Sequence, residues 1–224
     1  MPVETMSVPE TIFTALTPGD LDAIFSLHLE ALAAVGRPEL VKPESKEFFE
    51  RMLAGAGRVI GASRDGALIA YGVLQFDLPS SEDARPLLAL DSGDDLAKLA
   101  GASVHPSVWG KGLHDALIGR RIEEAGRLAI RHLYSTSAPG NARSWANLLD
   151  RGFCVRGIIE KYGGHLRYVL YRDLALTPGR SGEGLWCDVG DIARQRLLIA
   201  NGFAGARWRT REDGGFDICY REAR

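Results

Sequence analysis

The sequence of 224 residues predicts a mixed α/β fold, in which strands alternate with amphipathic helices. Apolar residues recur at helical spacing over residues 113–129, after a strand that ends at Val104 and a glycine-containing turn. Hairpin turns at Asp65-Gly66 and Gly163-Gly164 each join two apolar runs and predict antiparallel strands. The polar residues of the helix, expected off its apolar face, are Arg120, Arg121 and Glu124.

The first half of the chain contains the elements that lead up to the glycine turn. The first helix has an apolar face on or near which His28 falls, and a core histidine is more typical there than a ligand. Polar residues with prolines predict a loop at 77–94, near the entrance for an acceptor. The expected elements are a strand at 12–16, helices at 21–32 and 43–53, and strands at 58–63, 67–76 and 96–104.

The second half predicts a strand, a helix and a hairpin, and then the same series again. Residues 184–221 repeat the plan of residues 134–172, so that Gly202-Phe203 matches Gly152-Phe153 fifty positions earlier. We therefore expect a main domain at residues 10–174 and a C-terminal strand–helix–hairpin arm, a partial repeat, at residues 175–224. The arm, reached by a linker at 177–184, is expected to extend the sheet, cover an edge strand or swap into a partner to give a homodimer.

Composition argues against several classes of function. The net charge of −2 gives no electrostatic case for binding nucleic acid or an anionic membrane. No apolar run is long enough to span a bilayer, and residues 1–9 look like a loose tail without the features of a signal peptide. The three cysteines form no Cys-x-x-Cys pair, so we expect no zinc site, no disulfide framework and a reducing, cytoplasmic location.

The turn between strand 96–104 and its helix is suited to binding an anion. The first turn of a helix presents backbone N–H groups without partners, and the helix dipole adds positive charge there. Gly110 and Gly112 would let a phosphate approach the backbone, and Lys111 adds a full charge. A Rossmann fingerprint would need glycine in place of Asp115, and a P-loop would need a different spacing. The turn is thus a candidate pyrophosphate site or a plain connection.

The run Val-His-Pro-Ser-Val-Trp-Gly-Lys-Gly-Leu at 104–113, followed by a helix, a strand, Asn141 and Gly152-Phe153, resembles the GNAT superfamily of N-acetyltransferases. The resemblance covers residues 11–172. Of the family's Gln/Arg-x-x-Gly-x-Gly/Ala turn, Gly112 matches the central glycine, while Trp109 and His114 depart from it. The resemblance implies an α/β fold of the α+β type, with a mixed, mostly antiparallel central sheet flanked by helices.

The resemblance also implies a ligand and the residues that contact it. Acetyl-CoA or another acyl-CoA would be the co-substrate, the acceptor would be an amine of a small molecule or peptide, and no metal would take part. In the family a backbone N–H near Val104 polarises the thioester carbonyl, while Asn141 either contacts the CoA arm or only caps its helix. The candidate cofactor-binding residues are Ala102, Val104, Trp109, Gly110, Lys111, Gly112, Leu113, His114 and Asn141.

The acceptor side is less well defined by the sequence. In GNAT proteins the first two helices border the acceptor pocket, so Glu30, Glu44 and Glu50 are acceptor contacts or simply solvated charges. Many GNAT enzymes place a tyrosine acid seven residues after the asparagine, where this chain has Leu148, which we interpret as a core residue. Alternatives for the acid are Tyr134, Ser135, Ser137 or water, and candidates for the base are Asp94, Asp95 and His105.

Two functions follow from this pattern. The first is an acyl-CoA-dependent N-acyltransferase, in which the acceptor amine attacks the thioester directly and positioning supplies much of the rate. The second is a GNAT-fold protein that binds CoA or a partner without turnover, which the residues Trp109, His114 and Leu148 keep open. Transfer to a hydroxyl is a weaker third, because it needs a stronger base.

Overall fold

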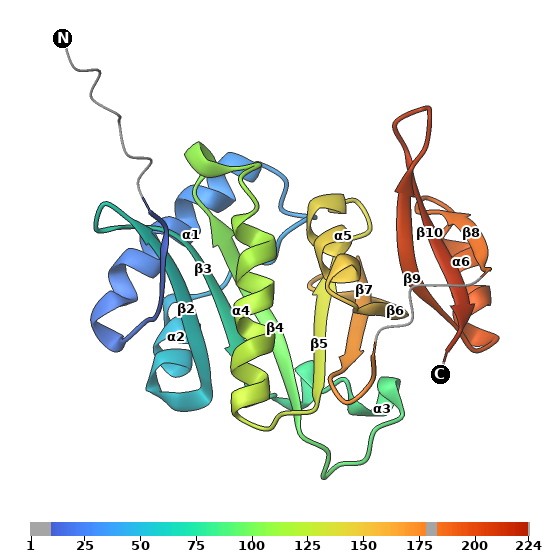
Figure 1. The fold of residues 1–224 in the computed structure, drawn as a ribbon, viewed down its shortest axis with the longest axis horizontal. Helices are drawn as coiled ribbons and strands as arrows, with labels where there is room; N and C mark the ends of the chain where they lie inside the picture. The colour runs from blue at the N-terminus through green and yellow to red at the C-terminus, as the bar shows by residue number, and fades with distance from the viewer. Residues whose placement is uncertain (1–9, 178–182, 224) are drawn as a thin grey trace.

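The computed structural model of the chain describes residues 10–177 and 183–223, and within them one ten-stranded sheet crosses the molecule (Figure 1). The strand order is β1-β2-β3-β4-β5-β7-β6-β9-β10-β8, and of the described pairs only β4–β5 is parallel. The predicted fold class, a mixed and mostly antiparallel sheet flanked by helices, is confirmed. The strands are β1 (Ile12–Ala15), β2 (Gly57–Arg64), β3 (Ala67–Gln75), β4 (Leu96–Val104), β5 (His132–Ser137), β6 (Cys154–Lys161), β7 (His165–Asp173), β8 (Leu185–Asp188), β9 (Phe203–Thr210) and β10 (Phe216–Glu222).

The helices cover both faces of this sheet. The expected tail at 1–9 and most of the expected linker at 177–184 lie outside the described residues. Within the described part, no helix is long and apolar enough to cross a membrane. The segment 77–94, which the sequence predicts as a loop, contains a short 3-10 helix, Ser80–Glu82, and the short α-helix α3 (Arg85–Leu88). The α-helices are α1 (Leu21–Val35), α2 (Lys46–Arg51), α3 (Arg85–Leu88), α4 (Leu113–Arg127), α5 (Ala142–Asp150) and α6 (Ile192–Ala200).

Alternation along the strands assigns each helix to a face. Tyr71 and Val73 of β3 pack with α1 and α2, whereas Ala70 of the same strand packs with Leu117 of α4. The strands β4, β5 and β7 present one set of side chains to α3 and the other to α4 and α5. The α1–α3 face and the α4–α5 face therefore lie on opposite sides of β4 and β5, where the two strands come together.

Arg121 corrects one expectation for α4. The sequence analysis placed it off the apolar face, but it is 2% exposed, in line with Leu117 and Ala125 at intervals of four residues. Its guanidinium donates to the carbonyl oxygens of Leu117 at 3.0 Å, Val73 at 3.3 Å and Ala100 at 3.4 Å. Burial without a carboxylate partner lowers its pKa to about 9. An arginine that binds carbonyls can thus take an apolar position in the helix.

The sheet opens where β4 and β5 diverge. These strands pair only from Leu96↔His132 to Lys98↔Tyr134, although β4 continues to Val104. Just beyond the last pair, β4 contains a bulge against β3, since the register shifts between Leu74↔Leu99 and Gly72↔Ala102. Arg121 donates to carbonyls on both strands of this bulge. The divergence leaves a gap between two parallel strands that side chains from both faces line.

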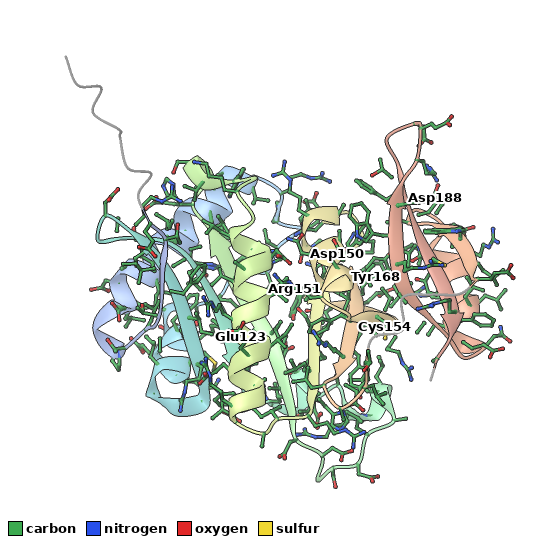
Figure 2. All side chains as sticks on the ribbon, in the orientation of Figure 1. Glu123, Asp150, Arg151, Cys154, Tyr168 and Asp188 are labelled. Carbon is green, nitrogen blue, oxygen red and sulfur yellow. The ribbon has the colours of Figure 1, made fainter. Side chains whose placement is uncertain are left out.

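The C-terminal arm extends the sheet at β6, one of the three placements expected for it. β8, α6, β9 and β10 follow in the predicted order, and β9 joins β6 through the pair Val155↔Gly205 (Figure 1). Gln195 of α6, fully buried, accepts hydrogen bonds from Tyr168 at 2.8 Å and Tyr220 at 2.7 Å. Tyr168 belongs to β7 and lies on the side of the sheet near the arm (Figure 2). The arm packs on its own chain.

Candidate functional site

A cleft of about 600 Å³ occupies the gap between β4 and β5. Its walls are the bulged half of β4, the end of β5, the turn before α4, the first part of α5, the end of α1 with the loop before α2, and the β6–β7 hairpin. A cleft that runs from one face of a sheet to the other can hold two reactants that approach from opposite sides. The α4–α5 side and the α1–α3 side differ in chemistry.

The α4–α5 side ends in an exposed helix N-terminus. Gly110 and Gly112 have φ of +77° and +74°, which favours glycine, and open space surrounds the position of a Cβ at each. Gly112 is the N-cap of α4, and no side chain caps the helix there. Trp109 donates from Nε1 to the carbonyl of Val104 at 2.7 Å, which pins the turn to the end of β4. The first-turn N–H groups are therefore open to an anion.

The structure brings most of the predicted cofactor-binding residues to this cleft. Lys111 is exposed in the turn and is not part of the lining. Asn141 occupies the N-cap position of α5, but its side chain makes no capping hydrogen bond, so helix capping does not account for it. The predicted cofactor-binding residues that line the cleft are Ala102, Val104, Trp109, Gly110, Gly112, Leu113, His114 and Asn141.

His114 turns its ring toward α5. Asn147 donates from Nδ2 to Nδ1 of His114 at 2.9 Å, an arrangement that requires a neutral ring. Burial, with Arg121 nearby, lowers the pKa of His114 to about 4. Asp115, the next residue of α4, binds Arg151 at the end of α5 at 2.6 Å. A neutral pair and an ion pair thus join α4 to α5, and Arg151 lies between the two helices in Figure 2.

The family of the chain follows from its sequence. The sequence profile of the Acetyltransferase (GNAT) family matches residues 21–153. The chain belongs to the GNAT acetyltransferase family. No curated protein matches its sequence. The GNAT profile ends at the start of β6, before the hairpin and the arm.

Solved GNAT structures show the same fold. The ribosomal-protein-S18-alanine N-acetyltransferase from Escherichia coli has a TM-score of 0.57 and 19% identity, covering 79% of this chain and 99% of its own. The yncA structure from Salmonella typhimurium, which holds its cofactor acetyl-CoA, has a TM-score of 0.57 and 18% identity, covering 77% of this chain and 99% of its own. A ribosomal-protein-alanine N-acetyltransferase from Brucella melitensis has a TM-score of 0.56 and 20% identity, and the match covers 73% of this chain and 99% of its own. At these identities the likeness establishes the GNAT fold.

On the α1–α3 side of the GNAT cleft, His28 anchors a buried polar network. The backbone N–H of Glu44 donates to Nε2 of His28 at 2.9 Å, so Nδ1 carries the proton and donates to the hydroxyl of Tyr71 at 2.8 Å. The hydroxyls of Tyr71 and Ser103 lie 3.1 Å apart, and Ser103 lines the cleft. Burial lowers the pKa of His28 and raises that of Tyr71. His28 is a core histidine, as expected, and it holds the loop before α2 in place.

Glu44 lies where the cleft meets the bulge. Its side chain is 8% exposed and pairs with Lys42 at 2.9 Å. A Cβ on Gly101 would lie 3.3 Å from Cγ of Glu44, so the carboxylate arm rests against the bulged segment of β4. Burial raises the pKa of Glu44 above its ordinary value, although Lys42 opposes the shift. A carboxylate of raised pKa at this point is suited to accept a proton.

Four of the sequence-based candidates for catalysis, the three for the base and Tyr134, do not reach the cleft. Asp94 and Asp95 precede β4 at its far end, and His105 binds Ser107 at 2.7 Å and faces Glu30 at 3.3 Å. None of the three lines the cleft. Tyr134 is also absent from the lining, and its hydroxyl donates to the carbonyl of Glu82 under α3.

Of the proposed acids, only two serines remain beside the cleft. Ser135 and Ser137 line it, and Ser135 donates to the carbonyl of Leu99 at 2.8 Å. Leu148 is 2% exposed and packs in the main hydrophobic cluster, which agrees with its interpretation as core.

Several residues of the site escaped sequence reasoning. Arg143 lines the cleft and lies 5.9 Å from the centre of the Trp109 ring, one position beyond the start of α5. Its place two residues after Asn141 was the available signal. Lys42, Lys98 and Arg167 also line the cleft, but they come from three distant segments, and no local pattern connects them. The described residues contain no group of three or more His, Cys, Asp or Glu placed to hold a metal.

Proposed function

We propose that this protein transfers an acetyl group from acetyl-CoA to a primary amine of a small molecule or peptide by direct attack. The observation that carries the proposal is the cleft between β4 and β5, which leads from the uncapped N-terminus of α4 to a buried carboxylate at the bulge. GNAT membership makes acyl transfer the expected chemistry. The alternative, binding without turnover, is an outcome of the test below.

Acetyl-CoA fits the α4–α5 side of the cleft. Its pyrophosphate would accept from N–H groups of the glycine turn and the start of α4, residues 110–113, with Arg143 as a further cation. Ala102 and Val104 would contact the pantetheine arm along β4, while Trp109, His114 and Asn141 would border it. Lys111 would act at longer range, because it lies outside the lining. When bound, acetyl-CoA supplies a thioester whose acyl carbon is open to an amine.

The residues at the bulge would handle the proton and the developing charge. Glu44 would accept the proton of the acceptor amine, directly or through one water. Its pKa is raised towards neutral pH, which makes the carboxylate a better general base. The backbone N–H groups of the bulged β4 segment would stabilise negative charge on the carbonyl oxygen. Ser103, held by Tyr71, offers a hydroxyl on the same wall. The leaving thiolate has a pKa of roughly 8.5, so a strong acid is not required.

The first test is the melting temperature with and without millimolar acetyl-CoA. A ligand that binds only the folded state at about a hundred times its dissociation constant adds about 2.7 kcal/mol of stability. We expect a clear upward shift, followed by CoA release when a panel of amines is added. A shift without release for any amine would favour the non-catalytic alternative, and no shift would refute the CoA site.

Glu44→Gln separates binding from chemistry in the same assay. It should leave the acetyl-CoA shift intact, because Glu44 lies on the α1–α3 side, and lower kcat about 100-fold, as for loss of a general base. Unchanged kcat would exclude Glu44 as the base.

The division of the chain forms part of this proposal. Residues 10–174 would be the acyl-CoA-binding domain and residues 175–224 a partial repeat without a CoA site of its own. Because β9 already pairs with β6, a homodimer of this chain would use a surface other than that sheet edge. The three cysteines are free, which fits a reducing compartment such as the cytoplasm.

A further inference from the structure

Four cations gather around Tyr162 on the α1–α3 side of the cleft. Lys42 and Lys161 place Nζ at 5.1 Å and 5.4 Å from the centre of the Tyr162 ring, and the Arg167 guanidinium carbon lies at 5.5 Å. Lys98 contacts the Tyr162 hydroxyl at 3.4 Å. The four come from the loop before α2, the start of β4, the end of β6 and the start of β7. We call Lys42, Lys98, Lys161 and Arg167 the cationic cluster.

Two carboxylates compensate only part of this charge. Glu44 binds Lys42 at 2.9 Å, and Glu82 binds both Lys98 at 2.5 Å and Lys161 at 2.8 Å. Four positive charges thus face two negative ones within the cluster, which leaves two in excess. Since Lys98 and Lys161 share Glu82, the excess lies with these two lysines and Arg167.

Arg167 has no carboxylate partner among the described residues. It is 3% exposed, Nη1 donates to the carbonyl of Leu166 at 2.8 Å, and the buried Nη2 has no hydrogen-bond partner. Burial lowers the pKa of this guanidinium. A buried arginine whose N–H donor lacks a partner costs stability unless an anion accepts a hydrogen bond from that donor. Planar guanidinium groups bind carboxylates through two parallel hydrogen bonds.

The cluster lies beside the point where the acceptor amine would react. Lys98 belongs to the last pair of β4 with β5, directly before the bulge, and Lys42 is two residues from Glu44. Lys42, Lys98, Tyr162 and Arg167 all line the cleft that holds Glu44. A small acceptor could place its amine at Glu44 and a negative group at Arg167 at the same time.

We propose that the acceptor carries a carboxylate next to its amine, as an amino acid does, and that Arg167, with Lys98 and Lys42, binds this carboxylate. This inference rests on the proposed function and narrows its acceptor class. Arg167 orients the acceptor and the lysines add attraction. Neutral amines of the same size would leave Arg167 unpaired, and so they would react more slowly.

The test compares amino acids with their carboxamides as acceptors, because the two differ in charge but hardly in shape. We expect kcat/KM to be about 100-fold higher for the acids, as expected when a site contains a buried group that only one substrate can pair. Arg167→Gln should reduce the acid-to-amide ratio to near unity. Arg209→Gln, an arginine of β9 outside the cleft, makes the same change in net charge and should leave the ratio unaltered. An equal rate for acids and amides with the wild type would overturn the proposal.

A second variant and a binding measurement keep the test decisive. Should Arg167→Gln fail to fold, Lys42→Gln at the partly exposed rim should lower the same ratio several-fold; an unchanged ratio would contradict the cluster's role. N-acetyl amino acids, with CoA present, should raise the melting temperature more than their amides do. If N-acetyl amino acids raise the melting temperature more than their amides but no amine releases CoA, the carboxylate site is supported and the proposed acetyl transfer is refuted. Better turnover of aminoalkylphosphonates than of amino acids would overturn the assignment to a carboxylate.

Discussion

Residues 132–173 and 185–222 run through the same elements, strand, helix and hairpin, with different results. At the start of the first helix, Asn141 leaves its side chain free and lines the cleft; fifty positions later, Asp191 uses Oδ1 to cap α6 through the N–H of Arg194 at 3.0 Å. In the hairpins, Arg167 faces Ile159 across the strands and lacks a carboxylate among the described residues. Its counterpart Asp217 faces Arg209 and binds it at 2.8 Å.

The difference shows which structural features form the cleft of this chain. In the first series, β5 stands beside a parallel strand that diverges from it, and the uncapped end of α4 lies next to the gap. In the second, β8 is the last strand of the sheet, so no parallel neighbour can diverge from it. Charged side chains of the second series pair with one another, as in the contacts of Arg211 with Asp213 and Asp217. Both series contain the strand–helix–hairpin unit, but only the first has the gap beside a parallel strand, and the cleft lies in that gap.

The largest effect should come from Gly112→Glu. It places a negative side chain in the space that a phosphate would enter, and we expect acetyl-CoA affinity to fall about a thousandfold, or about 4 kcal/mol. Titration calorimetry measures the loss. Gly202→Glu is the matched control, since Gly202 in the arm also has a positive φ, of +84°, and open space around a Cβ. Similar affinity in both variants would contradict the anion site at α4.

Gln195→Leu should break the contact between the two series. It removes the acceptor of Tyr168 and Tyr220 and the donor to the carbonyls of Asp188 and Val189. Leaving these buried polar groups without hydrogen-bond partners should lower the unfolding free energy by about 3 kcal/mol, measured by urea unfolding. The affinity for acetyl-CoA should not change. Tyr220→Phe, which removes one of these bonds, should cost about 1 kcal/mol. A loss of affinity in Gln195→Leu would mean that the arm shapes the cleft.

Leu148→Ala and Leu198→Ala compare equivalent helix positions. Leu148 is 2% exposed, so its truncation should cost about 3 kcal/mol by lost burial and a cavity. Leu198 is only partly buried, and the cost there should be about 1 kcal/mol. Urea unfolding gives both values. A large fall in turnover without a loss of stability in Leu148→Ala would show that this residue serves catalysis.

Acid should destabilise the cleft region through a group that the arm lacks, since all five histidines precede residue 166. The pKa of His114 is about 4 in the folded chain and near 6.5 when unfolded, so the unfolded chain binds the proton first as pH falls. The contribution of His114 is therefore present above pH 6.5 and is lost as the pH falls from 6.5 to 4, by about 3 kcal/mol. His114→Asn should flatten that part of the stability profile, and a slope equal to that of the wild type would contradict the shift.

The smallest effects should separate the two N-cap residues. Asp191→Ala removes a capping bond and should cost about 1 kcal/mol of unfolding free energy without affecting acetyl-CoA. Asn141→Ala should instead weaken acetyl-CoA binding several-fold, with little change in stability, because its side chain caps nothing. If Asn141→Ala lowered stability and left acetyl-CoA binding unchanged, Asn141 would not belong to the proposed cofactor site.

Local signals in the sequence were enough for most of the architecture. The Asp65-Gly66 turn has φ of +51° and +78°, and the strands on either side lie within a residue or two of their predicted bounds. The glycine turn and its helix were also predicted, because glycines and apolar spacing act over a few residues. The order of the elements in the arm was predicted because residues 184–221 repeat the plan of residues 134–172.

What the sequence could not supply depends on distant contacts. The sequence predicts Arg121 off the apolar face of its helix, whereas carbonyl groups of β3 and β4 bind it in the interior. The cationic cluster joins residues 42, 98, 161 and 167, whose proximity exists only after the sheet has formed. The short α3 was missed because four residues give no periodicity.

The pair Val155↔Gly205 joins each series to the other at the same position, fifty residues apart. Around it the strand orders β5-β7-β6 and β9-β10-β8 mirror each other, as the two halves of a symmetric dimer do. Here both halves belong to one chain, so their association is unimolecular and has an effective concentration set by the tether. Dilution that would separate a true dimer should leave this junction closed, so the β6 edge of the half that contains the cleft should stay covered at any protein concentration.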